Sequence, residues 1–158
     1  MPHIHERIDW TVVAYLVYQN KVLFVFHKEL QKWLPLGGHI ELDEDPDEAL
    51  VREVKEESGI EDIEVLAIRP NIRVDASERK FLYTPSYMDI HTINEKHRHI
   101  GLVYFLRVKT DAIRLAEQEH TEIRWLVKEQ FDDPKFHLEE SIKFYAEEAL
   151  QRARTQPD

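Results

Sequence analysis

The stretch from Gly38 to Ile60 constrains this chain most, because it predicts a short acidic loop followed by a helix with well-marked ends. Asp45 is a good N-cap, Pro46 suits the first helical position, and Glu48 is spaced to complete a capping box. Gly59 suits the left-handed conformation that commonly ends a helix. The stretch therefore predicts a helix that begins after Asp45 and ends before Gly59.

One face of this predicted helix is strongly acidic. Helical spacing places Leu50, Val51 and Val54 on one side. The other side carries Arg52, Glu53, Glu56 and Glu57. Two carboxylates about 4 Å apart repel each other by roughly 4 kcal/mol at an effective dielectric constant of about 20. Arg52 can neutralise one carboxylate, so the others require either solvent or a hard divalent cation such as Mg²⁺ or Mn²⁺.

The spacing of the fixed residues favours the cation. Five residues separate Gly38 from Glu44, seven separate Glu44 from Arg52, and the chain continues as REVKEESGI. This pattern resembles the Nudix signature, G-x5-E-x7-R-E-U-x-E-E-x-G-U with U aliphatic, and it matches at every fixed position. At ordinary residue frequencies, a chance full match in a chain of this length is below about one in a million. By this resemblance the chain is identified as a member of the Nudix hydrolase superfamily.

The resemblance implies an activity, a cofactor and a set of site residues. Nudix enzymes hydrolyse a diphosphate linked to another moiety and need a divalent metal ion, here Mg²⁺ or Mn²⁺. The metal ligands that it implies are Glu53, Glu56, Glu57, the carbonyl of Gly38 and, from a later acidic loop, Glu119. The catalytic residues that it implies are Glu53, Glu56 and Arg52. Glu53 is either a third carboxylate ligand or the base that deprotonates water, and Arg52 orients a carboxylate. Glu44 either joins the cluster or has a structural role.

Length and composition restrict the classes of protein to which this chain can belong. The chain has 158 residues, of which 42% are hydrophobic and 33% charged, so we expect one globular domain over residues 1–158 with frayed ends at about 1–7 and 155–158. It has no apolar run of membrane-spanning length, no signal-peptide pattern and no cysteine, which favours the cytoplasm. The net charge of −10 disfavours long nucleic acid. The expected partner is a small nucleoside diphosphate derivative, and the resemblance is compatible with a homodimer.

Strands are predicted on both sides of the helix. The apolar run at residues 10–18 predicts a strand that is buried on both faces and forms a hairpin with residues 22–26. The later predicted elements are strands at 63–68, 100–108 and 122–126, a short strand at 72–74, a helical turn at 127–131 and an amphipathic helix at 138–154. Residues 81–93 are extended, and Pro85 indicates an edge or a bulge. This order predicts an α/β protein with a mixed sheet between helices, in agreement with the Nudix-like α/β/α sandwich that the resemblance implies.

The substrate is less constrained, because the residues that select it follow no spacing rule. We expect the loops at residues 27–33, 69–91 and 110–121 to contact it. The candidate substrate-binding residues are His27, Lys32, Arg73 and His91. The proline and tyrosine markers of ADP-ribose and dinucleoside polyphosphate hydrolases are missing around residues 74–78, which favours a nucleotide pyrophosphatase. The alternatives are a non-catalytic nucleotide-binding or sensing Nudix domain, and an enzyme acting on a nucleotide sugar or a dinucleoside polyphosphate.

Three of the nine histidines, His91, His97 and His99, lie close together in the sequence. Three interpretations remain open for them. They line a substrate pocket, they are ordinary strand or loop histidines with His97 and His99 on one strand face, or they bind zinc. No zinc-ligand spacing motif supports the last interpretation.

Overall fold

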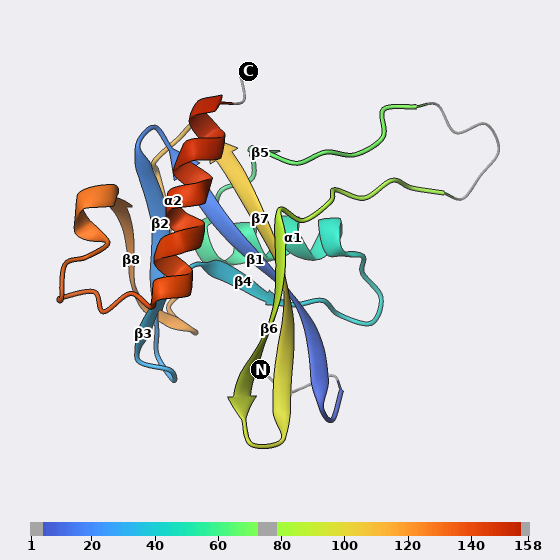
Figure 1. Cartoon of the computed structure of the whole chain (residues 1–158), viewed down its shortest axis with the longest axis horizontal. Coiled ribbons are helices and arrows are strands. Elements are labelled where there is room, and N and C mark those ends of the chain that lie inside the picture. The colour runs from blue at the N-terminus through green and yellow to red at the C-terminus, as the bar shows by residue number, and fades with distance from the viewer. Residues whose placement is uncertain (1–4, 73–78, 156–158) are drawn as a thin grey trace.

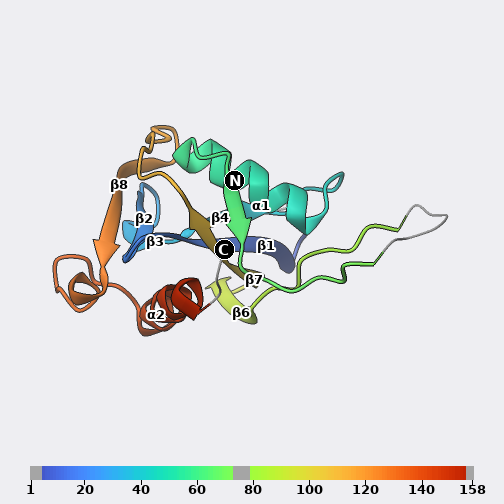
Figure 2. The ribbon, with the colours of Figure 1, turned by 90° about the horizontal axis from the view of Figure 1, so that it is seen from above.

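The computed structural model describes residues 5–72 and 79–155, and it contains a mixed eight-stranded sheet between two helices (Figure 1). The strand order is β3-β2-β1-β7-β5, while β4 pairs with β1, β6 with β7 and β8 with β2. Helices α1 and α2 lie on opposite faces of the sheet, as Figure 2 shows. The predicted α/β/α sandwich is therefore confirmed.

The elements alternate along the chain much as the sequence predicts. In order they are β1 (Ile8–Tyr18), β2 (Lys21–His27), β3 (Lys32–Leu34), β4 (Leu36–His39), α1 (Pro46–Ser58), β5 (Ile63–Val65), β6 (Tyr87–Asn94), β7 (His97–Val108), β8 (His120–Val127), the 3₁₀ turn η1 (Lys128–Gln130) and α2 (Glu140–Thr155). Neither helix has the length and apolar character of a membrane span within the described chain.

Strand β1 is the centre of the sheet. It runs parallel to β7 from Ile8 to Val17, and on its other side it pairs antiparallel with β4 and then with β2. Its side chains alternate between two cores. Val12, Ala14 and Leu16 pack on the α1 side, whereas Tyr15 and Val17 pack on the α2 side. The sheet thus holds α1 in a fixed position against β4.

The predicted ends of α1 are confirmed. The Asp45 side chain accepts a hydrogen bond from the Glu48 N–H, and the Glu48 side chain accepts one from the Asp45 N–H, which completes the capping box. Pro46 is the first helical residue. Gly59 has a φ of 78° and donates its N–H to the carbonyl of Lys55, so it closes the helix in the left-handed conformation.

Two predictions of burial are wrong in part: the inward face of α1, and the complete burial of the first strand. Val51 is 48% exposed, whereas Glu53 and Glu57 are buried. Leu50 and Val54 are buried as predicted, and the carboxylates of Glu53 and Glu57 are buried with them because both lie against the backbone of β4. Trp10, expected to be buried within the first strand, is 45% exposed, since it lies near the open end of β1.

Several predicted boundaries also shift. β5 ends at Val65 rather than at residue 68, β7 begins at His97, β8 begins at His120, and α2 covers 140–155. β6 begins after Pro85, pairs only with β7 among the described strands, and has an irregularity between Thr92 and Asn94, as expected for a bulged edge strand. The predicted strand at 72–74 lies mostly outside the described residues, as do the chain ends 1–4 and 156–158.

Candidate active site

A glycine pair in β4 lets the carboxylates of α1 approach the sheet. A Cβ atom at Gly38 would lie 2.2 Å from Oε1 of Glu53, so no side chain fits there while Glu53 keeps its position. Gly37 has a φ of 152°, and a Cβ at that position would lie 2.2 Å from the carbonyl oxygen of Val12. Gly38 is therefore needed for the close contact between β4 and α1, and Gly37 for the close contact between β4 and β1.

Glu57 is held from both sides in this contact. Its Oε1 accepts a hydrogen bond of 3.1 Å from the Gly37 N–H, and its Oε2 lies 2.9 Å from Nε2 of His120. The side chain of Glu57 is 4% exposed. Burial raises the pKa of Glu57, while the hydrogen bond from His120 opposes that rise. Glu57 is thus a buried carboxylate whose orientation is fixed.

Glu53 lies one helical turn before Glu57 and is also buried, at 3% exposure. Its Oε1 accepts a hydrogen bond of 2.8 Å from Arg52. Burial raises the pKa of Glu53 to about 7; the nearby charges of Glu57 and Glu56 add to the rise, and the Arg52 hydrogen bond opposes it. A carboxylate with this pKa can bind or release a proton near neutral pH.

Arg52 connects the acidic residues to one another. Its Nε donates to Oε2 of Glu44 at 3.0 Å, and one terminal nitrogen donates to Glu53 and, at 3.2 Å, to Glu56. The other terminal nitrogen donates to Glu44 and to the carbonyl of His39, the latter at 3.0 Å. The hydrogen bonds from Arg52 lower the pKa of Glu44. Arg52 therefore has a supporting position, and Glu44 is its principal partner.

A second loop reaches the same cluster and brings a residue that the sequence did not reveal. Ligand atoms of Glu57, Glu119 and His120 all lie within 4.8 Å of one another. The ring of His27 lies 5.5 Å from that of His120, and burial, followed by the charge of His120, lowers the pKa of His27. His120 was not predicted because it follows the acidic loop without any motif. Only its place at the start of a strand opposite His27 identifies it.

The other predicted substrate-binding residues either lie apart from this cluster or fall outside the residues that the structure describes. Lys32 forms a 2.6 Å ion pair with Glu139. His91 lies in β6 beside Asp89, on the sheet face opposite α1. Arg73 is outside the described residues. Of the three candidates that the structure describes, only His27 adjoins the carboxylates.

The donor set fits a hard divalent cation. One rigid helix supplies three carboxylates, those of Glu53, Glu56 and Glu57. The side chain of Glu56 is 60% exposed to solvent. Such oxygen donors are the ligands that Mg²⁺ and Mn²⁺ prefer. Two of the carboxylates are buried beside each other, and a cation would offset the cost of ionising both.

Comparison with known proteins agrees with this geometry. The family model of the NUDIX domain matches residues 8–147. The chain belongs to the NUDIX family. A search of curated proteins gave no match for this NUDIX chain. Family membership supports hydrolase activity on pyrophosphate-containing compounds.

Solved NUDIX structures share the fold. A hydrolase of the NUDIX family from Clostridium perfringens is 29% identical, with a TM-score of 0.75 over 90% of this chain and 96% of that one. An Ap4A hydrolase from C. elegans is 18% identical, with a TM-score of 0.59 over 94% of this chain and 95% of that one. The NUDIX domain of Shewanella oneidensis NrtR, solved with ADP ribose, is 16% identical, with a TM-score of 0.60 over 98% of this chain and 91% of that one. The last two show similarity of fold alone.

Proposed function

We propose that this chain is a divalent-cation-dependent hydrolase that cleaves a diphosphate linkage in a nucleoside di- or triphosphate or a related nucleotide. The burial of Glu53 and Glu57 against the β4 glycines carries the proposal. Two adjacent carboxylates held out of water lower the stability of the metal-free protein, and a bound cation would offset that cost. The chain keeps every box carboxylate, which favours an enzyme over a non-catalytic nucleotide sensor.

Each site residue has a role in the proposed reaction. The proposed ligands of Mg²⁺ or Mn²⁺ are Glu53, Glu56, Glu57, Glu119 and the carbonyl of Gly38. When bound, the ion would screen the diphosphate, lower the pKa of water and stabilise the leaving oxygen. Arg52 keeps Glu53 and Glu56 in place through hydrogen bonds of 2.8 and 3.2 Å. Glu53 is either a ligand or the base that accepts the proton of the water attacking phosphorus, while the phosphorus–oxygen bond to the leaving group breaks.

We place the phosphate-bearing end of the substrate beside the loops that follow β2 and precede β8. The N–H of Lys28 donates to the carbonyl of Glu119 at 3.0 Å, which joins the two loops next to Glu57. His27 is the proposed substrate contact because its ring adjoins His120 at the same place. Lys32 and Arg73 remain candidates for more distant parts of the substrate.

A substrate panel tests this function. Nucleoside triphosphates, nucleotide sugars, ADP-ribose and dinucleoside polyphosphates should be incubated with the protein and Mg²⁺ or Mn²⁺, with EDTA as the control, and the products identified by phosphorus NMR. We expect cation-dependent cleavage of a diphosphate linkage in at least one class. Binding of a nucleotide without any hydrolysis would instead support the sensing domain, and hydrolysis that persists in EDTA would contradict the role of the cation.

A further inference from the structure

A second group of metal-binding side chains lies on the opposite face of the sheet from α1. The register aligns Asp9 of β1 with His99 of β7, and His39 of β4 with Thr11, two residues after Asp9. Side chains at aligned positions, and at positions two apart, project from the same face of a sheet. Asp9, His39 and His99 therefore share one face, although 89 residues separate the first from the last.

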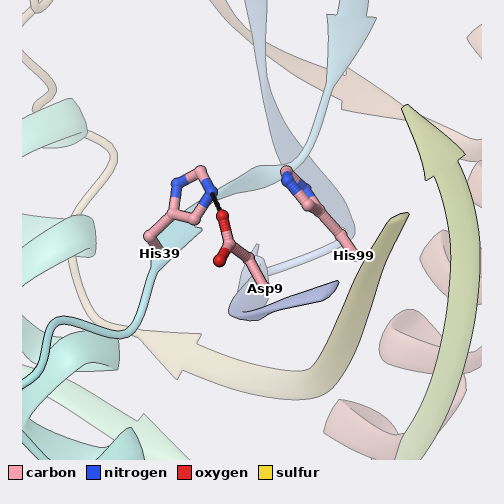
Figure 3. A group of neighbouring side chains, drawn as sticks. All are labelled: Asp9, His39 and His99. Atoms are coloured by element: carbon pink, nitrogen blue, oxygen red, sulfur yellow. Dashed lines mark ion pairs between the residues drawn. The ribbon is translucent and has the colours of Figure 1, made fainter. Parts of the chain in front are cut away.

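Asp9 is the centre of this group. Its side chain is 1% exposed. Its Oδ2 lies 3.0 Å from Nε2 of His39 and 3.2 Å from Nε2 of His97, while its Oδ1 accepts a 2.7 Å hydrogen bond from the His5 N–H. Figure 3 shows Asp9 between the rings of His39 and His99, with a nitrogen of His39 facing the carboxylate. The ring centroids of His39 and His99 are 4.8 Å apart.

His97 lies on another side of the Asp9 carboxylate. Its Nδ1 lies 3.2 Å from the backbone carbonyl of Glu6, which can only accept, so Nδ1 carries a hydrogen. Its Nε2 faces Oδ2 of Asp9 at 3.2 Å. The same Asp9 oxygen therefore has an imidazole nitrogen of His39 and one of His97 beside it.

We propose that Asp9, His39 and His99 form a second metal site that binds Zn²⁺. One ligand atom from each residue can be chosen so that all three lie within 4.8 Å of one another. In a tetrahedral site with bonds of about 2.0–2.1 Å, ligand atoms are about 3.3 Å apart, so a small inward movement suffices. Nε2 of His97 is the nearest additional donor, because it lies beside the same Asp9 oxygen.

The donor chemistry separates this site from the one on α1. Two imidazoles and one carboxylate suit zinc and similar transition metals, whereas the all-carboxylate set of α1 suits Mg²⁺ or Mn²⁺. Zn²⁺ at this position would join β1, β4 and β7 at one end of the sheet.

The site has a route to the other face through His39. The ring of His39 belongs to the zinc site, and the backbone carbonyl of His39 accepts a 3.0 Å hydrogen bond from Arg52. A metal that fixes the ring also fixes the backbone partner of Arg52. The zinc inference rests on its own residues, so it stands or fails independently of the proposed hydrolase function.

Zinc titration of the full chain tests the site. His120→Gln serves as the background, so that the group of Glu57, Glu119 and His120 contributes little. In this background, with excess Mg²⁺ present to occupy the carboxylates of α1, we expect one Zn²⁺ per chain by calorimetry. Adding His39→Gln or His99→Gln should weaken the affinity about 100-fold or more, and adding His97→Gln about 10-fold. His137→Asn, which changes an exposed histidine outside the group, is the matched control and should leave the affinity unchanged.

X-ray absorption of zinc bound to the His120→Gln protein supplies a test that needs no ligand variant. We expect a four-coordinate spectrum with nitrogen and oxygen neighbours that include at least two imidazoles. The proposal is overturned if this protein binds no Zn²⁺, if the bound ion has only oxygen neighbours, or if His99→Gln binds as tightly as its parent.

Discussion

Burial of Glu53 should make the stability of the metal-free protein depend on pH. The pKa of Glu53 is raised to about 7 in the folded state, from an ordinary value of 4.5. Between these two pH values the folded protein keeps a proton that the unfolded chain has released. The free energy of unfolding therefore falls as the pH rises through this window, and the full cost is present above about pH 7.

The magnitude follows from the size of the shift. The difference between 7 and 4.5 is 2.5 pKa units, and each unit corresponds to about 1.4 kcal/mol. Glu53→Gln does not titrate, so between about pH 4.5 and 7.5 the wild type should lose about 3 kcal/mol of unfolding free energy relative to this variant. Urea unfolding in EDTA, repeated at intervals across this range, measures the difference.

Glu56→Gln is the matched control for this experiment. Glu56 lies on the same helix, but its side chain is 60% exposed. Burial is the main cause of the raised pKa of Glu53 and the charge of Glu56 only a minor one, so this variant should keep most of the pH dependence of the wild type. Addition of Mg²⁺ should stabilise the wild type more at about pH 8 than at pH 5, because the cation and the proton compete for the same carboxylates. An equal pH dependence in Glu53→Gln and the wild type would show that burial does not raise the pKa of Glu53.

Two further predictions concern α1. Gly38→Ala introduces a Cβ atom 2.2 Å from Oε1 of Glu53. We therefore expect the carboxylate to move and the rate of hydrolysis to fall about 100-fold. A rate close to that of the wild type would show that this contact is unimportant for hydrolysis. Asp45→Ala removes the 3.0 Å hydrogen bond from the Glu48 N–H and the ion pair with Lys80, so urea unfolding should show a loss of about 1 kcal/mol, and an unchanged midpoint would contradict the capping role.

The features that depend on local sequence were predictable. The ends of α1 follow from Asp45, Pro46 and Gly59, because capping is determined by residues within one turn of the helix end. The face of the same helix was predictable from hydrophobicity only in part. Leu50 and Val54 are buried as predicted, but Val51 is exposed and Glu53 is buried, because the contact with β4 at Gly38 brings this carboxylate inward in spite of its polarity.

The features that depend on strand register were not predictable. His120 meets Glu57 only because β8 pairs with β2 and brings the start of β8 to the end of α1. Asp9, His39 and His99 come from three strands that are distant in sequence, so no ligand spacing reveals them. The cluster of nearby histidines in the sequence pointed to this region, but Asp9 and His39 became visible only in the folded sheet.

The most direct test of the central claim is the value of kcat/KM for Mg²⁺-dependent hydrolysis in Glu57→Gln compared with the wild type, on the best substrate from the panel. The folding of the variant should first be verified by circular dichroism. If the buried carboxylates of α1 hold the catalytic cation, kcat/KM should fall about 1,000-fold or more, equivalent to a loss of several kcal/mol of transition-state stabilisation. A folded Glu57→Gln protein whose kcat/KM stays within about 10-fold of the wild type would contradict the account.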